Sequence, residues 1–282
     1  MAIPLFLARR IGEKYLDQDF KDRLKRLHFR DAGHGYDAFG LHPDIVIYGA
    51  AITKWLYEKY FRVISIDSHH IPSEGAAIMA INHSGTIPVD GMMIWHDVLR
   101  QTDPPRCLRG IADHFVPALP VIGATFARGG IVGGSRGNVR ALLNAGELLM
   151  IFPEGTPGII KPFKDRYKLR DFRVGHAELA IAHQVPIVPV GIVGAEEQLP
   201  SLFSSKVLGN LMGLGSVPIP LTPIPLPVRY RIIYGEPIDV ASLYRPEQAD
   251  DPDVVSSLAA IVQAGVSSLI KRGLSERTGV FK

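Results

Sequence analysis

The chain has 282 residues, which exceeds a typical single domain, but α/β folds often reach this length around one sheet. Cys107 is its one cysteine, which excludes internal disulfides and four-cysteine metal sites and fits a reducing compartment. The formal charge of +3 is unevenly placed, because residues 1–30 hold eight Lys or Arg against four acidic residues and the remainder sums to −1. A basic end indicates an anionic surface as partner.

That surface is predicted to be a membrane and not nucleic acid, since no basic patch interleaved with stacking aromatics occurs elsewhere. The amino terminus MAIPLFLARR has too short an apolar run, with arginines on the wrong side, for a secretory signal. No stretch reaches the roughly 18 uninterrupted apolar residues of a spanning helix. We therefore expect a peripheral protein on the cytoplasmic side of the membrane.

The first 62 residues predict two helices. An imperfect helical stripe with basic residues beside it runs through residues 5–30: Leu5, Ile11, Leu16, Phe20, Leu24 and Leu27. A second helix is expected over about 43–60, opened by Pro43. Its Trp55, Tyr57 and Tyr60 lie among basic residues, as in an interfacial anchor. We predict that 1–62 is an N-terminal two-helix membrane-associating element and 63–282 an α/β domain; helices packed on the core are the alternative.

Apolar runs and helical segments then alternate along the chain. Strands are predicted at 61–67, 76–82, 106–112, 147–152, 185–193 and 228–235. Helices are predicted at 88–100, 136–146, 172–183 and 252–271. This rhythm indicates the fold class α/β, with a mostly parallel or mixed sheet covered by helices on both faces.

One segment does not follow the rhythm. Residues 207–228 carry no charge, and their five prolines and three glycines forbid a straight helix. The segment is either a Pro-rich loop laid over the core or a flap that faces lipid or lines an acyl chain.

Two loops at predicted strand ends carry candidate catalytic groups. In Asn82–Asp90, a general base can be formed by His83 with the Asp90 carboxylate fixing its tautomer. Asn82 can hold the loop by hydrogen bonds and is also predicted to bind substrate. In Phe152–Thr156, Glu154 lies in a turn whose glycine lets the backbone approach a ligand. Because the carboxyl ends of strands in an open α/β sheet border one crevice, both loops are expected to share a site. A surface pair and a turn cap are the structural alternatives.

The blocks NHSGTIPVD, ARGG at 127–130, FPEGT and VPIVPV at 185–190, in that order, resemble those of the glycerolipid acyltransferase family that contains the lysophosphatidate acyltransferases. The resemblance implies transfer of a fatty acyl group from acyl-CoA or acyl carrier protein to a glycerolipid hydroxyl, as in phospholipid biosynthesis. It implies His83 as base and Asp90 as its partner. Glu154, Gly155 and Thr156 would lie in the acceptor site, and Arg128 would bind the acceptor. No cofactor is implied beyond the acyl co-substrate, and the histidines show no zinc spacing.

The blocks depart from the family pattern in two places. Six residues separate His83 from Asp90, where the family has four, which resembles a divergent branch close to neutral-lipid acyltransferases. Pro157 follows the FPEGT threonine, where the family usually has an arginine. A phosphate on the acceptor would then need Lys161, Lys164 or Arg166 as its cation. The expected acceptor is a lysophospholipid such as lysophosphatidate, and a mono- or diacylglycerol is the alternative.

Two other classes of function compete with acyl transfer. Residues 133–137 match G-x-S-x-G, and Ser135 is followed by Asp171 and by His176 or His183 in the order of a serine lipid hydrolase. That reading leaves His83 and the FPEGT turn unexplained. A non-catalytic lipid-binding protein would not need His83.

Overall fold

The computed structural model describes residues 4–84, 88–113, 122–205, 207, 209 and 217–282. Within them a seven-stranded sheet has the order β1-β9-β6-β2-β5-β3-β4, and a separate two-stranded sheet pairs β7 with β8. β6, β2, β5, β3 and β4 are mutually parallel, whereas β9 runs antiparallel to β6. The mixed sheet of the predicted fold class is confirmed. Its strands are β1 (Ile64–Ile66), β2 (Ala77–Ile81), β3 (Arg109–Ala112), β4 (Val132–Gly133), β5 (Leu148–Ile151), β6 (Ile187–Val193) and β9 (Arg231–Tyr234).

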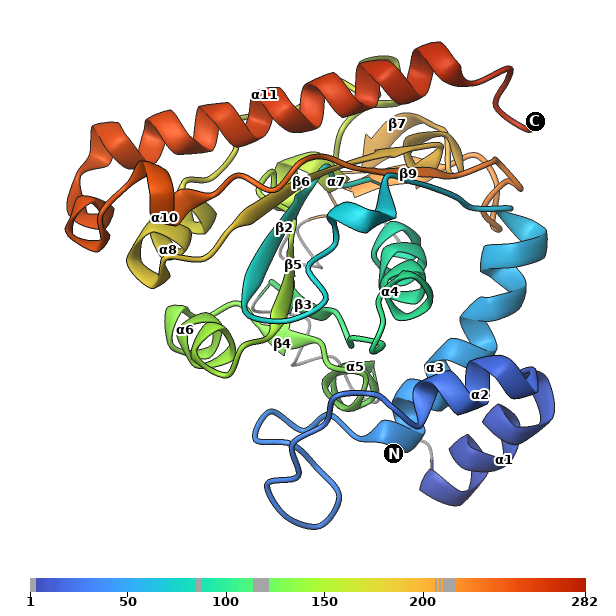
Figure 1. The fold of residues 1–282 in the computed structure, drawn as a ribbon. Helices are drawn as coiled ribbons and strands as arrows, with labels where there is room; N and C mark the ends of the chain where they lie inside the picture. Colours follow the sequence, from blue (N-terminus) through green and yellow to red (C-terminus); the bar gives the residue numbers. More distant parts are fainter. Residues whose placement is uncertain (1–3, 85–87, 114–121, 206, 208, 210–216) are drawn as a thin grey trace.

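Helices cover both faces of this sheet (Figure 1). One face packs against α6 (Arg136–Asn144), α8 (Gly175–His183) and α11 (Pro252–Glu276). The other packs against α3 (Pro43–Trp55) and α4 (Val89–Gln101). The remaining helices are α1 (Leu5–Tyr15), α2 (Gln18–Leu24), α5 (Ile122–Arg128), α7 (Thr156–Ile159) and α10 (Val240–Leu243), with a π-helical turn at Leu56–Tyr60.

β2 shows why its sequence is apolar at every position. Successive strand side chains point to opposite faces, so Ile78 contributes to the core under α11 while Met79 contributes to the core under α4. Every residue of β2 is buried because β5 and β6 flank it and helices cover it on both sides. The loop that follows β2 therefore starts from a strand that is buried on both faces.

The stripe at residues 5–30 forms two helices where one was expected. The chain breaks after Leu16 because Asp17 caps α2, its side chain accepting a hydrogen bond from Phe20 N at 2.9 Å. Phe20 and Leu24 are buried in the same core as Met79 of the sheet. The N-terminal helices thus share a core with the sheet, and the boundary at residue 62 stays a prediction.

The aromatic cluster at the end of α3 is divided between surface and core. Trp55 is 59% exposed, whereas Tyr57 is buried and donates a hydrogen bond to Asp97 Oδ1 at 2.7 Å. The buried Asp97 also accepts from Tyr234 and Ser65, at 2.6 and 2.8 Å. Tyr57 therefore joins the π-helical turn to α4 and, through Asp97, to the sheet. Because Tyr57 is buried, its prediction as part of an interfacial anchor is wrong.

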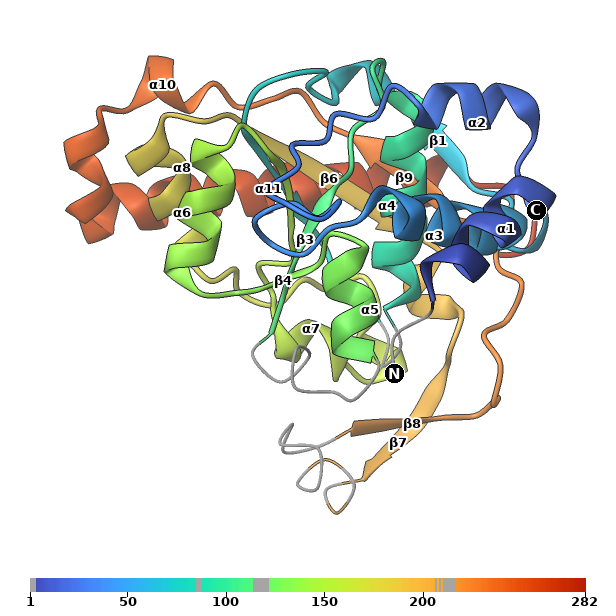
Figure 2. The same ribbon diagram turned by 90° about the horizontal axis from the view of Figure 1, so that it is seen from below.

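The uncharged segment 207–228 contributes to a hairpin of β7 (Ser201–Ser205) and β8 (Val217–Pro220), which projects from the body (Figure 2). Residues 208 and 210–216 of the segment lie outside the described residues. Leu221 and Ile224 are 52% and 67% exposed, so the described part of the segment does not lie wholly over the core.

Among the described residues, α11 alone is long and apolar enough to cross a membrane. Its buried residues recur at helical spacing and pack on the sheet in one core: Val255, Leu258, Ala259, Val262, Val266 and Ile270. The structure packs one face of α11 on the sheet.

Candidate active site

Neighbouring strands end at the same edge of the sheet and deliver polar side chains there. His83 follows β2, Glu154 follows β5, and Asp113 follows β3, which pairs with β5. Glu196 follows β6 on the other side of β2. The structure thereby brings together the two loops that the sequence predicted to share a site.

His83 and Asp90 form a hydrogen-bonded pair. His83 Nδ1 lies 2.8 Å from Asp90 Oδ2, with the imidazole 12% exposed and the carboxylate fully buried. Asp90 also accepts from the backbone N–H groups of Ser84 and Gly91, at 2.9 and 2.7 Å. Since an ionised carboxylate only accepts, Nδ1 carries the proton and Nε2 presents its lone pair. Residues 85–87 of this loop lie outside the described residues.

Two neighbours fix the plane and position of the imidazole. The ring of Phe152 stacks on His83 with centroids 3.9 Å apart and planes inclined by 20°. Gly158 lies so close that a Cβ there would come within 3.2 Å of His83 Cβ and 2.9 Å of Glu154 Cβ. Phe152 was recognised in the sequence only as part of a block, because stacking across two strands leaves no local signal.

Glu154 is a buried brace. Its Oε1 accepts from His83 N at 3.0 Å, and its Oε2 accepts from Arg170 N at 2.8 Å. Lys161 Nζ lies 3.1 Å from the same Oε2. With 1% exposure and both oxygens occupied, Glu154 holds the His83 loop and does not face an acceptor hydroxyl. The prediction that Glu154 binds the substrate directly is therefore wrong.

The Lys161 ammonium group is also occupied by protein partners. Its ammonium lies between Glu154 and Glu196, 3.2 Å from Glu196 Oε1, and it donates to Lys168 O. The side chain is 3% exposed, so Lys161 is not available to bind a phosphate, contrary to the sequence-based prediction. Burial raises the pKa of Glu196 to about 7, although Lys161 acts in the opposite direction.

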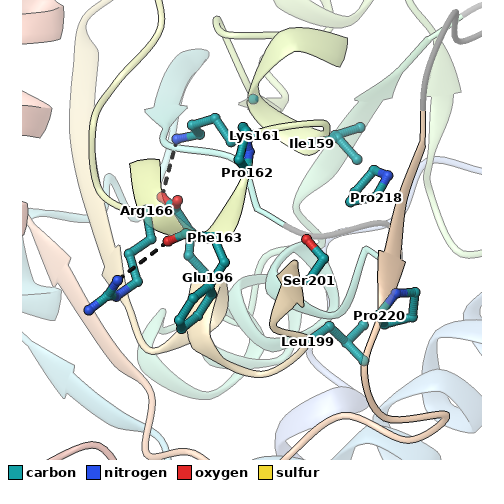
Figure 3. Close-up of a pocket in the computed structure, with 11 residues that line it drawn as sticks. Ile159, Lys161, Pro162, Phe163, Arg166, Glu196, Leu199, Ser201, Pro218 and Pro220 are labelled. Atoms are coloured by element: carbon teal, nitrogen blue, oxygen red, sulfur yellow. Dashed lines mark hydrogen bonds and ion pairs between the residues drawn. The ribbon is translucent and has the colours of Figure 1, made fainter. Parts of the chain in front are cut away.

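A small pocket adjoins this brace (Figure 3). Ile159 and Phe163 line it from the chain after Gly158, and Pro218 and Pro220 line it from the hairpin. Its polar wall includes Glu196, whose contact with Lys161 is drawn in the figure. Its volume of about 30 Å³ accommodates water and is too small for an acyl chain.

Asn82 and Arg128 lie elsewhere than predicted. Asn82 is fully buried and exchanges hydrogen bonds of 3.1 and 2.8 Å with the backbone of Ile192, so it joins β2 to β6 and does not meet a ligand. Arg128 packs over the ring of Tyr36, and Gly130 lies against Cys107, just before β3 begins. Arg128 is therefore at the amino end of the parallel strands, opposite the edge that bears His83.

Arginines that the sequence analysis passed over lie at the carboxyl edge. Arg136 follows β4 and forms an ion pair with Glu178 at 2.8 Å. Arg173 contacts the turn at Gly155, whose φ of +58° suits glycine. Thr156 Oγ1 donates to Asp113 Oδ2 at 3.1 Å, which ties the turn to the end of β3. Only strand order reveals that these residues share an edge.

The serine hydrolase alternative has no geometric support. Ser135 is the N-cap of α6, its Oγ accepting from Asn138 N at 3.1 Å. His176 is buried and donates to Arg173 O, while His183 pairs with Asn144. Within the described chain neither histidine forms a hydrogen bond with Ser135.

The fold and the site define a class: an α/β protein with a hydrogen-bonded histidine–aspartate pair at the carboxyl edge of its sheet. Residues 62–193 match the family model described as Acyltransferase. An uncharacterized protein of Mycobacterium tuberculosis is 36% identical over 261 residues, covering 88% of this chain and 72% of that one. The DGAT1/2-independent enzyme synthesizing storage lipids of Bos taurus is 28% identical over 168 residues, covering 60% and 49%.

The chain also resembles the crystal structure of the 1-acyl-sn-glycerophosphate (LPA) acyltransferase PlsC from Thermotoga maritima, with a TM-score of 0.57. That match covers 97% of this chain and 90% of the other at 18% identity, and it supports the fold. This chain belongs to the glycerolipid acyltransferase family.

Proposed function

We propose that this protein transfers a fatty acyl group from acyl-CoA, or from acyl carrier protein, to a hydroxyl of a lysophospholipid such as lysophosphatidate. The observation that carries the proposal is the 2.8 Å contact between His83 Nδ1 and Asp90 Oδ2. Such a pair supplies a general base with a fixed tautomer, which is what activation of a hydroxyl needs. Membership of the family supports acyl transfer to a glycerolipid.

In the proposed reaction His83 Nε2 removes the proton of the acceptor hydroxyl. The oxygen attacks the thioester carbonyl, and the tetrahedral intermediate collapses by breaking the carbon–sulfur bond. The imidazolium returns its proton to the thiolate, so ester and free thiol leave together. Asp90 stabilises the imidazolium that forms in between, and Phe152 keeps its plane fixed. No metal takes part in this scheme.

The neutral-lipid alternative remains the second candidate. It is favoured by the similarity to the storage-lipid enzyme and by Pro157 in place of an arginine after the FPEGT threonine. The lysophosphatidate acceptor is favoured by the fold shared with an LPA acyltransferase and by the arginines at the carboxyl edge. The chemistry of His83 is the same in both.

We further propose that the protein acts at the cytoplasmic face of a membrane as a peripheral protein. α1 exposes Phe6 (76%) and Leu7 (41%) beside Arg10 and Lys14, and α3 exposes Trp55. Apolar side chains next to cations suit an anionic lipid surface. These exposed groups support the predicted association of the N-terminal helices.

One assay tests both acceptor classes and both donors. Purified protein is incubated with labelled palmitoyl-CoA or palmitoyl carrier protein and with lysophosphatidate, other lysophospholipids, monoacylglycerol or diacylglycerol, and the product lipids are separated. We expect labelled phosphatidate as the main product. Exclusive labelling of di- or triacylglycerol would establish the neutral-lipid alternative, and release of fatty acid alone would contradict acyl transfer.

A further inference from the structure

The guanidinium of Arg173 lies against the backbone of Gly155, in the turn that follows β5. A Cβ at residue 155 would come within 2.8 Å of Arg173 Cζ and 3.0 Å of Nη1. Glycine at this position, with φ of +58°, therefore leaves room for the flat guanidinium on the surface of the turn. The same turn leads to Gly158, which packs against His83.

The backbone around Arg173 is held on several sides. Arg173 N donates to Pro153 O at 3.0 Å, and Arg173 O accepts from the buried His176 at 2.8 Å. Three residues earlier, Arg170 N donates to the buried Glu154. The backbone of Arg173 is thus fixed relative to the His83 loop. A ligand that binds the guanidinium therefore causes a smaller loss of conformational entropy.

The guanidinium lies on an exposed residue. Within the described residues Arg173 makes no side-chain hydrogen bond or ion pair. The nearby cations differ: Lys161 is enclosed by Glu154 and Glu196, and Arg136 is paired with Glu178. A positioned guanidinium with five free donors is suited to a planar or tetrahedral oxyanion.

We propose that Arg173 binds a phosphate group of a substrate at the Gly155 turn, two residues before Pro157, the position at which the family usually has a cation. This inference rests on the proposed function for the identity of the substrates. The phosphate belongs either to a lysophosphatidate acceptor or to the coenzyme A donor, and the binding chemistry is the same. Arg173 reaches the turn from a segment 18 residues after Gly155, which is why the local sequence pattern does not show it.

The test compares Arg173→Gln and Arg173→Lys with Arg140→Gln, which removes an exposed α6 cation that has no protein partner among the described residues. A charge-assisted hydrogen bond to phosphate is lost in Arg173→Gln, so we expect KM for the phosphate-bearing substrate to rise roughly tenfold or more. Arg173→Lys keeps the positive charge but loses the planar guanidinium. Its KM should lie between those of the wild type and Arg173→Gln. Arg140→Gln should match the wild type.

KM values for four substrates show whether the bound phosphate belongs to the acceptor or to the donor. A raised KM for lysophosphatidate with an unchanged KM for monoacylglycerol assigns it to the acceptor, and a raised KM for palmitoyl-CoA with an unchanged KM for palmitoyl-pantetheine assigns it to the donor. Either result supports the proposal. Unchanged KM values for all four, or equal losses with and without phosphate, would overturn it.

A binding measurement separates this inference from the proposed reaction. Calorimetric titration with glycerol 3-phosphate and with coenzyme A is carried out on the wild type and Arg173→Gln. Weaker binding of either ligand to the variant supports the inference even if no acyl transfer is detected, which would refute only the proposed function. Equal binding by both proteins, or no binding of either ligand by the wild type, counts against Arg173.

Discussion

His83 and Glu154, 71 residues apart, are joined by a hydrogen bond of 3.0 Å from the backbone N–H of His83 to Glu154 Oε1. The Glu154 carboxylate therefore holds the backbone of the proposed base in place and does not contact its imidazole ring. Since Lys161 and Arg170 N occupy the other oxygen, the two strand-end loops form one connected unit.

Removal of the proposed base should nearly abolish acyl transfer. General-base catalysis contributes about 10²–10⁴-fold, so His83→Ala should lower kcat by that order, with circular dichroism unchanged. Asp90→Asn should also lose much of the rate because the imidazolium loses its partner. As a control, Ser135→Ala removes a helix cap, costs about 1 kcal/mol of stability and keeps kcat. Loss of kcat in Ser135→Ala with kcat retained in His83→Ala would instead support the serine hydrolase alternative.

Lys161 should matter more for stability than Glu154. Lys161→Met leaves two buried carboxylates without their cation, at a cost of about 3–5 kcal/mol, whereas Glu154→Gln leaves Lys161 paired with Glu196. We expect Glu154→Gln to cost about 1.5–3 kcal/mol, and the double variant to cost less than the sum. Urea unfolding of the three variants measures this. Additive costs would show that the groups do not interact.

Glu196 should make stability depend on pH. Because its pKa is raised from an ordinary value of 4.5 to about 7 in the folded protein, the folded state retains a proton that the unfolded state loses. Stability therefore falls as pH rises between these values. In Glu196→Gln this fall is absent, so Tm of the variant minus Tm of the wild type should increase from pH 5 to pH 7.5. A constant difference would mean that Glu196 titrates normally.

The contact between Tyr57 and Asp97 should stabilise the packing of the π-helical turn after α3 on α4. Tyr57→Phe deletes a donor to a buried carboxyl group and is expected to cost about 1–3 kcal/mol in chemical denaturation. The exposed Trp55 is the matched control, since Trp55→Ser should change stability by less than about 0.5 kcal/mol. Equal effects of the two substitutions would contradict the division of this cluster between core and surface.

Membrane binding should depend on exposed groups of α1. Deleting the N-terminal helices would remove Phe20 and Leu24 from the core, so point variants are the better test. We expect Phe6→Ser combined with Arg10→Glu to reduce sedimentation with anionic vesicles while Tm stays unchanged. Binding of the wild type should weaken with salt, since charges are screened over about 8 Å at 0.15 M. Equal sedimentation of both proteins at every salt concentration would argue against this surface.

Much of the fold could be predicted from the sequence. The apolar run before His83 and the one before Glu154 both form buried strands, and the helix opened near Pro88 begins at Val89. These elements can be predicted because the spacing of apolar residues within a short stretch of sequence indicates a strand or a helix. The two-residue strand β4 and the helix α5 were missed because neither has enough length for a period to show.

The partners of polar side chains were not predictable in the same way. Asn82, Lys161 and Glu154 were assigned to a ligand, and each is instead satisfied by protein groups distant in sequence. A buried polar atom takes whichever partner the strand order brings within about 3 Å, and strand order is a property of the whole sheet.

The sequence by itself determined the alternation of strands and helices, the His83–Asp90 pair and the resemblance of its blocks to a family. Only the tertiary structure decided that Arg128 lies at the opposite edge from His83, that Ser135 is a helix cap, and that Arg173 covers Gly155. Secondary structure and short motifs depend on residues a few positions apart. Which side chains meet depends instead on the order and direction of strands, which long-range packing of both sheet faces selects.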